Sequence, residues 1–532
     1  MALKVGESYK RYSGDENPDV IVIGSGIGGL AVAALLAKHA HKKVFVLERH
    51  YVAGGFTHVF ERPDYEWDVG LHYIGEVHRP HSLLRRLFDH ITDGKLQWSE
   101  MDEVYDRIHM GDKVYDFVAG RERFREKMKS YFPQEASAID RYLELVRDCV
   151  GSARLYFLDK SIPSLPSKLF GGVLRASFLK HASKTTREVL EGITRNQELI
   201  GVLTAQYGDY GLPPALSSFA IHAMVAHHYF NGGAYPVGGS SQIAASIAPL
   251  IDRVGGKILV RAEVSKILVE KDRAVGVQMK DGRVIRAKEI VSDAGLINTF
   301  TRLLPVEVMR KHELDCKVEQ VETSWSHICL YAGLAHTGKE LNLRSSNLWI
   351  YPDHRHEENL SRYLKDPSSP LPITYISFPS EKDPTFQTRY PGKSTIEIIG
   401  FTPYEWFAPW KGTAWQHRDA KYDSYKQQLA ERLLEQLYRY VPQVQGKVDY
   451  YELSTPLSTE HFTNHVGGAI YGLQHTPSRF SQKFLRPQTP IRHLYLTGQD
   501  ITTAGVTGAL FGGVLTASAI LRKNVLSLAL KT

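Results

Sequence analysis

The chain has 532 residues, 43% of them hydrophobic and 23% charged, which is the composition of a globular protein with a large core and two or more domains. A net charge of +7 is too dilute over this length to indicate nucleic-acid binding. The three cysteines, Cys149, Cys316 and Cys329, are widely spaced and exclude a disulfide framework, so a reducing compartment is expected.

The start of the chain carries no evident targeting signal, because residues 1–19 are polar and contain no apolar core segment. Residues 20–37, "VIVIGSGIGGLAVAALLA", are apolar enough for a membrane helix, but their glycines and charged flanks favour a buried strand, turn and helix. We therefore expect a cytoplasmic protein that does not span a membrane, with a peripheral membrane contact as the alternative.

The first motif, "DVIVIGSGIGGLAVAALLAKHAHKKVFVLE", predicts a strand, a glycine-rich turn, a helix and a second strand. Gly24, Gly26 and Gly29 permit a tight turn, close approach to a pyrophosphate and close packing of helix on strand. The helix N-terminus favours phosphate, and Glu48 is placed to accept hydrogen bonds from an adenosine ribose. This is the pattern of a Rossmann-type dinucleotide site.

A second glycine pair, Gly54 and Gly55 in "AGGFTHVF", follows directly after Glu48. Backbone that passes beside the ligand twice suits a long dinucleotide lying extended through the domain, which favours FAD over NAD. The alternative is that these glycines form only a surface turn.

The middle of the chain predicts two further segments. Residues 81–235 are predicted to be mainly helical with proline breaks, whereas residues 301–485 mix strands and helices. Residues 154–184 combine Leu, Phe and Tyr with Lys and Arg, which is typical either of a surface that dips into lipid or of an amphipathic helix packed on the protein.

Near the C-terminus, "HLYLTGQDITTAGVTGALFGGVLTASAIL" predicts a short strand, Gly498, Asp500 and then another glycine-rich helix that opens at residues 506–509. A second strand–GxGxxG–helix unit is not evident, and neither is a GxSxG, HExxH or Walker motif. The histidines lack a carboxylate at helical spacing, so no metal site is expected.

Together these segments resemble the phytoene desaturase and amine oxidase superfamily of FAD-dependent oxidoreductases, over residues 19–521. The chain resembles in particular the retinol saturases and their carotenoid isomerase relatives, through "DVGLHYIG", "HHYFNGGAYPVGGSSQIA", "FPSEKDPTF", "YPGKST" and "LYLTGQDI". It departs from that branch in two places. Phe56 and Thr57 replace a pair of cysteines, and the membrane-targeting leader of the animal enzymes is not evident.

The resemblance implies an α/β fold, with a Rossmann-type FAD-binding domain and an interleaved α+β substrate domain. The FAD-binding domain is expected to comprise residues 18–80, 236–300 and 486–524, and the substrate domain residues 81–235 and 301–485.

The resemblance also implies which residues bind FAD. The backbone of Val264 is expected at the adenine, Asp500 near the ribityl and phosphate groups, and the helix opening at Val506 at the pyrimidine edge of the flavin. The expected FAD-binding residues are Gly24, Ser25, Gly26, Ile27, Gly28, Gly29, Glu48, Arg49, Gly54, Gly55, Phe56, Thr57, His58, Val264, Gly498, Asp500, Val506, Thr507, Gly508 and Ala509.

Flavin N5 itself transfers the hydride, so few catalytic side chains are needed. His72 and Asp68 are the candidates beside the flavin, because an imidazole can deliver the proton that accompanies a hydride. The alternative is that Asp68 caps a turn and His72 packs in a polar niche of the core. Tyr229, Trp406 and Phe407 are candidates for the apolar lining of a polyene tunnel, with ordinary core packing as the alternative.

The function implied is reduction of a carbon–carbon double bond in a long apolar polyene, that is, a saturase. The alternatives are isomerisation of a carotenoid or polyunsaturated fatty acid without net redox change, desaturation, or lipid binding without turnover. The expected partners are the polyene and an external electron donor or acceptor, because no nicotinamide domain is evident.

Overall fold

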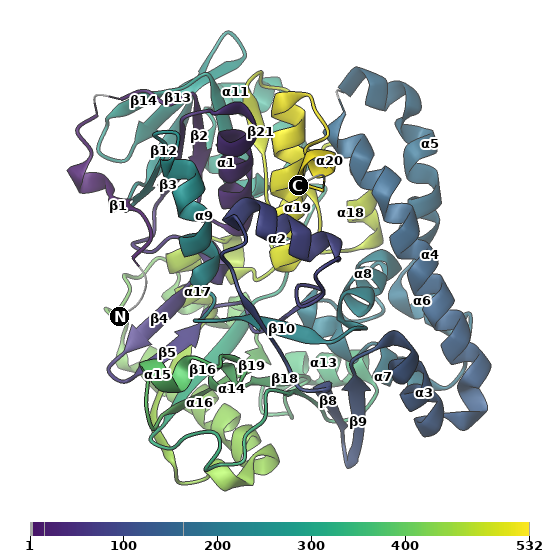
Figure 1. The fold of residues 1–532 in the computed structure, drawn as a ribbon. Coiled ribbons are helices and arrows are strands. Elements are labelled where there is room, and N and C mark those ends of the chain that lie inside the picture. Colours follow the sequence, from purple (N-terminus) through teal and green to yellow (C-terminus); the bar gives the residue numbers. More distant parts are fainter. Residues whose placement is uncertain (1–3, 15, 163, 531–532) are drawn as a thin grey trace.

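A parallel sheet organises one half of the molecule, as the computed structural model shows for residues 4–14, 16–162 and 164–530 (Figure 1). Its strand "VIVI" is buried on both faces, as an apolar run in a parallel sheet should be. In spatial order its six described strands are β1 (Glu7–Ser8), β11 (Lys257–Val260), β3 (Val44–Glu48), β2 (Val20–Ile23), β15 (Glu289–Ser292) and β21 (Leu494–Leu496).

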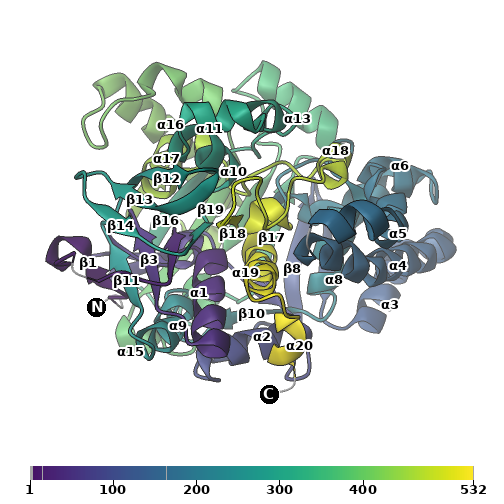
Figure 2. The ribbon, with the colours of Figure 1, turned by 90° about the horizontal axis from the view of Figure 1, so that it is seen from above.

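Helices cover one face of this sheet, and an antiparallel meander covers the other. Val20 and Val22 pack against the helices, whereas Ile21 and Ile23 pack against the meander, because successive strand residues point to opposite faces. The helices are α1 (Ile27–Ala40), α9 (Gln242–Asp252) and α19 (Gly505–Leu521), and the meander strands are β12 (Val264–Glu270), β13 (Arg273–Met279) and β14 (Val284–Arg286). Helices α1 and α19 lie side by side in both views (Figures 1 and 2).

A second, mixed sheet forms the other half. One face packs on α16 (Ala420–Tyr440), and the other face looks toward the parallel sheet. All neighbouring strands are antiparallel except the parallel pair β17–β8. Its seven described strands are β20 (Val448–Ser454), β16 (His327–Leu334), β19 (Ser394–Phe401), β18 (Thr374–Ser377), β17 (Asn347–Tyr351), β8 (Val104–Met110) and β9 (Lys113–Val118).

A layer of helices flanks both sheets on the right of Figure 1. Its longest member carries an apolar stripe that packs into an aromatic-rich core. The main helices here are α3 (Arg121–Tyr131), α4 (Ala136–Ser161), α5 (Ser164–Ala182) and α8 (Phe219–Tyr229). Shorter helices link the layers: α2 (Leu83–Thr92), α7 (Gln197–Leu203), α13 (His356–Lys365), α14 (Pro379–Lys382), α17 (Pro456–Thr463), α18 (Pro477–Ser481) and α20 (Val525–Ala529).

Residues 81–235 are mainly helical, as predicted, but residues 98–118 within them form three strands that the sequence analysis did not predict: β7 (Trp98–Glu100), β8 and β9. Strands β8 and β9 are a hairpin that turns at Gly111 (φ 60°) and completes the second sheet. The sequence "VYDRIHM" does not alternate clearly between apolar and polar residues, because Tyr105 and the charged Asp106 are both buried.

Residues 59–75 also leave the parallel sheet. They form β4 (Val59–Arg62), β5 (Tyr65–Asp68) and β6 (Ile74–Gly75), and the β4–β5 hairpin packs on the second sheet. The indole N–H of Trp67 anchors this hairpin by donating to the carbonyl of Ala332 (3.0 Å). Among the helices of the described residues, none combines the length and the apolar character that crossing a membrane requires.

Candidate functional site

A cavity of about 340 Å³ lies between the two sheets, within the size range of small-molecule sites. Its upper wall contains the residues at the carboxyl ends of β2, β3, β15 and β21, where parallel α/β sheets bind their ligands. Its lower wall comes from β16 to β19 of the second sheet. The cavity therefore lies between the edge of the parallel sheet where dinucleotides bind and one face of the second sheet.

Glycines around the carboxyl group of Asp293 form the upper wall. A Cβ atom on Gly26, Gly28 or Gly498 would lie 2.5–2.7 Å from an Asp293 carboxylate oxygen, closer than packed atoms approach. Burial raises the pKa of Asp293 to about 8, opposed by the backbone N–H groups of Gly29 and Gly26 that point at it. Asp293 was missed in the sequence, although an acid directly after a buried strand in "IVSDAG" was a signal for it.

Glu48, at the end of β3, holds the first glycine-rich turn in place through hydrogen bonds. One of its carboxylate oxygens accepts from the backbone N–H (2.9 Å) and the hydroxyl (2.7 Å) of Ser25, and the other accepts from the backbone N–H of His50 (2.7 Å). The hydroxyl of Ser25 also accepts from the backbone N–H of Gly54 (3.0 Å). These bonds tie the first glycine turn to the second glycine pair and leave Glu48 in the cavity wall.

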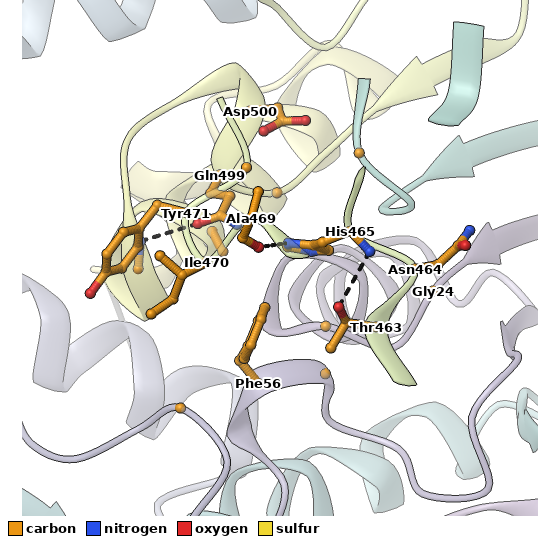
Figure 3. Close-up of a pocket in the computed structure, with 18 of the residues that line it drawn as sticks. Gly24, Phe56, Thr463, Asn464, His465, Ala469, Ile470, Tyr471, Gln499 and Asp500 are labelled. Atoms are coloured by element: carbon orange, nitrogen blue, oxygen red, sulfur yellow. Dashed lines mark hydrogen bonds between the residues drawn. The ribbon is translucent and has the colours of Figure 1, made fainter. Parts of the chain in front are cut away.

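The second glycine pair passes close to the first. A Cβ on Gly55 would lie 2.9 Å from Cα of Gly26, and both Gly54 and Gly55 have positive φ. The next residue, Phe56, occupies space that a side chain on Gly70 would fill, and its ring meets that of His465 edge-on at 5.1 Å (Figure 3). The pair is thus part of the cavity and not a surface turn.

Two helices begin at this wall with no side-chain cap. The N-terminal N–H groups of α1 begin at Gly26, and those of α19 begin at Ala504. Uncapped N–H groups and the helix dipole attract anionic groups. Asp500 is already engaged, because its carboxylate accepts from the backbone N–H groups of Leu296 (2.7 Å) and Leu473 (3.1 Å).

Most of the residues predicted to bind FAD line this cavity. Gly29 and Gly508 do not, because each packs tightly on backbone: a Cβ would lie 2.4 Å from the carbonyl oxygen of Gly24 and 1.9 Å from that of Thr503, respectively. Thr507 also lies outside the lining. Those that line it are Gly24, Ser25, Gly26, Ile27, Gly28, Glu48, Arg49, Gly54, Gly55, Phe56, Thr57, His58, Val264, Gly498, Asp500, Val506 and Ala509.

The lower wall is apolar and aromatic. Trp349, Tyr375 and Ile399 are direct cross-strand neighbours on β17, β18 and β19, so their side chains form one row along the cavity floor. The rings of Trp349 and Tyr375 are 4.5 Å apart. Trp325, Phe401 and Tyr471 continue the lining.

The predicted lining residues Tyr229, Trp406 and Phe407 are not part of it, which corrects that expectation. Tyr229 lies one layer behind, stacked on Tyr73 at 4.3 Å. Phe407 and Trp406 belong to the core under the far face of the second sheet. Aromatic density alone does not tell which face of a sheet a ring covers.

His72 lies in the lining and is held by a buried acid. Its Nδ1 is 2.6 Å from a carboxylate oxygen of Glu397, on β19, and the other oxygen of Glu397 accepts from the backbone N–H of Asp68 (2.8 Å). Burial lowers the pKa of His72 to about 4 and raises that of Glu397 to about 8. The pair is therefore neutral at pH 7, with Glu397 donating to Nδ1 and the imidazole proton on Nε2.

Asp68, the second predicted catalytic residue, lies outside the cavity lining. Its carboxyl group is buried, binds the hydroxyl of Tyr235 (2.5 Å) and accepts from the backbone N–H of Ser240 (3.3 Å). Burial raises the pKa of Asp68 to about 7. Its place behind His72 is that of a structural partner.

Lys382 completes the polar layer beneath the cavity. Its ammonium donates to the carbonyl of His72 (2.8 Å), the hydroxyl of Ser377 (2.7 Å) and the side-chain carbonyl of Asn347 (2.5 Å). Burial lowers the pKa of Lys382 to about 8, with Glu397 as the main opposing charge. Glu397 had a sequence signal as the lone charge inside the strand "STIEIIGF"; Lys382 had none beyond its place in "FPSEKDPTF".

Within the described residues, no group of three or more His, Cys, Asp or Glu side chains is arranged to hold a metal ion.

Comparison with known proteins agrees with this arrangement. The family model described as flavin-containing amine oxidoreductase matches residues 27–296. An all-trans-retinol 13,14-reductase of Danio rerio is 36% identical over 529 residues, covering 96% of this chain and 87% of its own. A prolycopene isomerase of an Oncidium hybrid cultivar is 26% identical over 524 residues, covering 94% of this chain and 83% of its own. The resemblance inferred from the motifs is confirmed.

The fold class is confirmed as well. The solved structure of a cyclohexylamine oxidase from Brevibacterium oxydans superimposes with a TM-score of 0.59 at 17% identity, covering 97% of this chain and 99% of that one. At this identity the likeness concerns the fold alone.

The glycine packing predicts how flavin retention responds to substitution. In Gly26→Ala the new Cβ would lie 2.6 Å from an Asp293 oxygen, so the purified variant should lose most of its flavin. Glu48→Ala should weaken flavin retention by about tenfold with a smaller effect on folding, since it removes one hydrogen-bonding carboxylate. The measurement is the flavin-to-protein absorbance ratio after gel filtration. Gly151→Ala is the matched control, because a Cβ there meets nothing within 4 Å; full flavin in Gly26→Ala would contradict the assignment.

Proposed function

Because the chain belongs to the flavin-containing amine oxidoreductases, in the branch of the retinol saturases and carotenoid isomerases, we propose that it is an FAD-dependent enzyme acting on a carbon–carbon double bond of a long apolar polyene. Saturation of the double bond is the favoured reaction. The observation that carries this proposal is one cavity in which a dinucleotide-type edge faces an aromatic floor and a neutral imidazole–carboxyl pair.

FAD is proposed as the flavin. The two glycine-rich turns and the uncapped start of α1 suit a pyrophosphate, and Glu48 suits the adenosine ribose. Val264, at the start of β12, lines the cavity beside Glu48's strand and suits the adenine. The start of α19 favours negative charge at the far end of the group.

The bound flavin supplies or accepts the hydride. The chain's own contribution begins with Trp349, Tyr375 and Ile399, whose apolar surfaces hold a hydrocarbon chain and exclude water from the reacting carbons. Burial of a polyene against them contributes roughly 0.8 kcal/mol per CH₂-sized unit.

Proton delivery falls to His72 and Glu397. As Nε2–H of His72 passes its proton to the substrate carbon next to the one that receives the hydride, the proton of Glu397 moves to Nδ1. The double bond then becomes a single bond, and the negative charge rests on Glu397. Lys382, bound to the carbonyl of His72, stabilises that charge until solvent returns the proton.

The electrons come from outside the chain, from an electron donor that reduces flavin, since the sequence has no second dinucleotide unit. Isomerisation is the second candidate. Its supporting observations are the relation to a prolycopene isomerase and Phe56 and Thr57 in place of the expected cysteines. Desaturation and lipid binding without turnover are the remaining outcomes of the product assay below.

The α4–α5 hairpin is proposed as the membrane contact. On α5, Leu169, Phe170 and Val173 are exposed by 70%, 64% and 82%, and Leu155 and Leu158 of α4 are also exposed. Near this surface Arg154, Lys180 and Lys184 are exposed, whereas Lys160 is buried and Arg175 and Arg187 are paired with Asp159 and Glu357. An apolar surface with surrounding positive charge suits an anionic lipid bilayer, the source of the polyene.

The reaction is tested by mass spectrometry of products from all-trans-retinol, a carotenoid and a polyunsaturated fatty acid, with chemically reduced enzyme in deuterated water. Saturation predicts a gain of two hydrogens, both of them deuterium, because the reduced flavin takes up its transferable hydrogen from the solvent, with one equivalent of flavin oxidised. An unchanged mass with a changed absorption spectrum would favour isomerisation. Loss of two hydrogens on oxidised enzyme would make the protein a desaturase, and recovery of unchanged lipid throughout would make it a binding protein.

The imidazole–carboxyl pair predicts a pH profile for reoxidation of the reduced enzyme by the polyene in a single turnover. The rate should stay level at lower pH and fall as pH rises through about 8, where Glu397 loses its proton. Glu397→Gln should slow the reaction by about 10²-fold or more and remove that fall, because an amide has no proton to pass on. Glu381→Gln is the control: burial also raises the pKa of Glu381, but its hydrogen bond comes from Ser380 (3.1 Å), away from the cavity. An unchanged profile in Glu397→Gln would refute this proton path.

The membrane contact predicts salt-sensitive binding to vesicles. Wild-type protein should co-sediment with phosphatidylcholine–phosphatidylserine vesicles more strongly than with phosphatidylcholine alone. Leu169→Glu combined with Val173→Glu should weaken this binding more than about tenfold. Val284→Glu, at another exposed apolar residue (49%), is the control. Equal binding by all three proteins would exclude the hairpin.

A further inference from the structure

Two buried basic side chains, Lys160 and Arg479, lie behind the loop that leads into α19. Lys160 is in the last turn of α4 and Arg479 is in α18, both to the right of α19 in Figure 1. Their exposed fractions are 7% and 3%. In the described part of the chain neither forms an ion pair, and the hydrogen bonds of both side chains go to backbone carbonyls.

Three of these carbonyls belong to the consecutive residues of the turn Gln499–Ile501. Nη2 of Arg479 donates to the carbonyls of Gln499 (2.8 Å) and Asp500 (2.9 Å), and the amino group of Lys160 donates to that of Ile501 (2.9 Å). Lys160 also donates to the carbonyl of Leu485 (2.6 Å). Every carbonyl of the turn is therefore held by a buried basic side chain.

The same turn belongs to the wall of the cavity. Gln499 and Asp500 line the cavity, and both are labelled in Figure 3. In a trans peptide the N–H and the C=O point in opposite directions, so the N–H of Asp500 points away from Arg479. That N–H has no acceptor among the described residues. The turn therefore offers a hydrogen-bond donor on the side that Arg479 does not occupy.

The turn also fixes the start of α19. The side-chain carbonyl of Gln499 accepts from the backbone N–H of Gly505 (3.4 Å), the first residue of that helix. The hydroxyl of Thr502 donates to the carbonyl of Gly508 (2.6 Å) in its first turn. A displacement of the turn would move the helix N-terminus with it, so Arg479 positions both.

The burial of Arg479 is costly and is not offset by a carboxylate of its own. Burial lowers the pKa of Arg479 to about 10, so the guanidinium is charged at pH 7, and its Nη1 has no partner among the described residues. The charge of Asp500 is the main opposing cause, but two backbone N–H groups already bind that carboxylate. A buried cation in this state stabilises negative charge placed beyond the turn.

A flavin gains negative charge when it is reduced, because two electrons and one proton convert the neutral oxidised ring into an anion. Positive charge near the ring therefore favours the reduced form. Resting on the proposed placement of the flavin at the start of α19, we propose that Arg479 is a positioning residue of the flavin site. It holds the Gln499–Ile501 turn in the cavity wall, with Lys160 as the second anchor, and its charge raises the reduction potential of the flavin.

The test is the two-electron reduction potential of flavin-loaded protein, measured by anaerobic titration against a reference dye. Arg479→Gln removes the charge and keeps a hydrogen-bond donor, so the potential should fall by about 30 mV or more. That fall is a tenfold decrease in the ratio of reduced to oxidised flavin at a fixed donor potential. Arg479→Lys keeps the charge, and its ratio should stay within about twofold of wild type.

Arg432→Gln is the matched control. Arg432 also donates to two backbone carbonyls, those of Pro367 (2.5 Å) and Ser369 (2.6 Å), but none of the three residues lines the cavity. The potential of this variant should equal that of wild type.

A wild-type potential in flavin-loaded Arg479→Gln would overturn the inference. A tenfold fall in Arg479→Lys would do the same, because the loss would then follow the shape of the side chain and not its charge. If Arg479→Gln retains no flavin, Arg479→Lys decides by this criterion. Absence of polyene conversion together with the expected potentials would refute the proposed reaction and leave the role of Arg479 standing, whereas a wild type that does not bind FAD would remove both.

Discussion

The structure depends on the close packing of glycine backbone around the carboxyl group of Asp293. Gly26 and Gly28 come from the start of α1 and Gly498 follows β21, yet all meet the same two carboxylate oxygens. Because no side chain intervenes, the carboxyl ends of three parallel strands lie within contact distance at one edge of the sheet. The N-termini of α1 and α19 consequently open on the same cavity. A single β-carbon at any of these glycines would separate the segments that form the upper wall.

In the second sheet, side chains and not bare glycine backbone form the wall of the cavity. Adjacent strands place Asp106, Asn347, Ser377 and Glu397 in one polar row, next to the apolar row of Trp349, Tyr375 and Ile399. The polar row is buried, so its charges are limited: Lys382 is the cation in contact with it, and a proton on Glu397 removes negative charge. Burial thus raises the pKa of these carboxyl groups, so that acids at the edge of the apolar cavity keep their protons near neutral pH.

The parts of the fold that depend on local periodicity were predictable. The strand–turn–helix of residues 20–40 and the helix after Gly505 follow from short-range patterns, as does the meander that starts at Val264. The cavity floor was not predictable, because Trp349, Tyr375 and Ile399 meet through long-range pairing that no local pattern encodes. For the same reason, aromatic density selected Trp406 and Phe407, which cover the wrong face of the sheet. His72 could be selected by its chemistry, but its partner Glu397 lies 325 positions away.

The replacement of the expected cysteine pair by Phe56 and Thr57 fits the local packing and constrains the chemistry. Phe56 fills the space left by Gly70, and the hydroxyl of Thr57 is satisfied by the carbonyl of Gly54 (2.8 Å). Among the described residues, the cysteines at 149, 316 and 329 all lie outside the cavity lining. A dithiol formed by these cysteines is therefore not part of this wall. In the proposed reaction, a flavin held by the first sheet would supply the electrons, and His72 with Glu397, on the second sheet, would supply the proton.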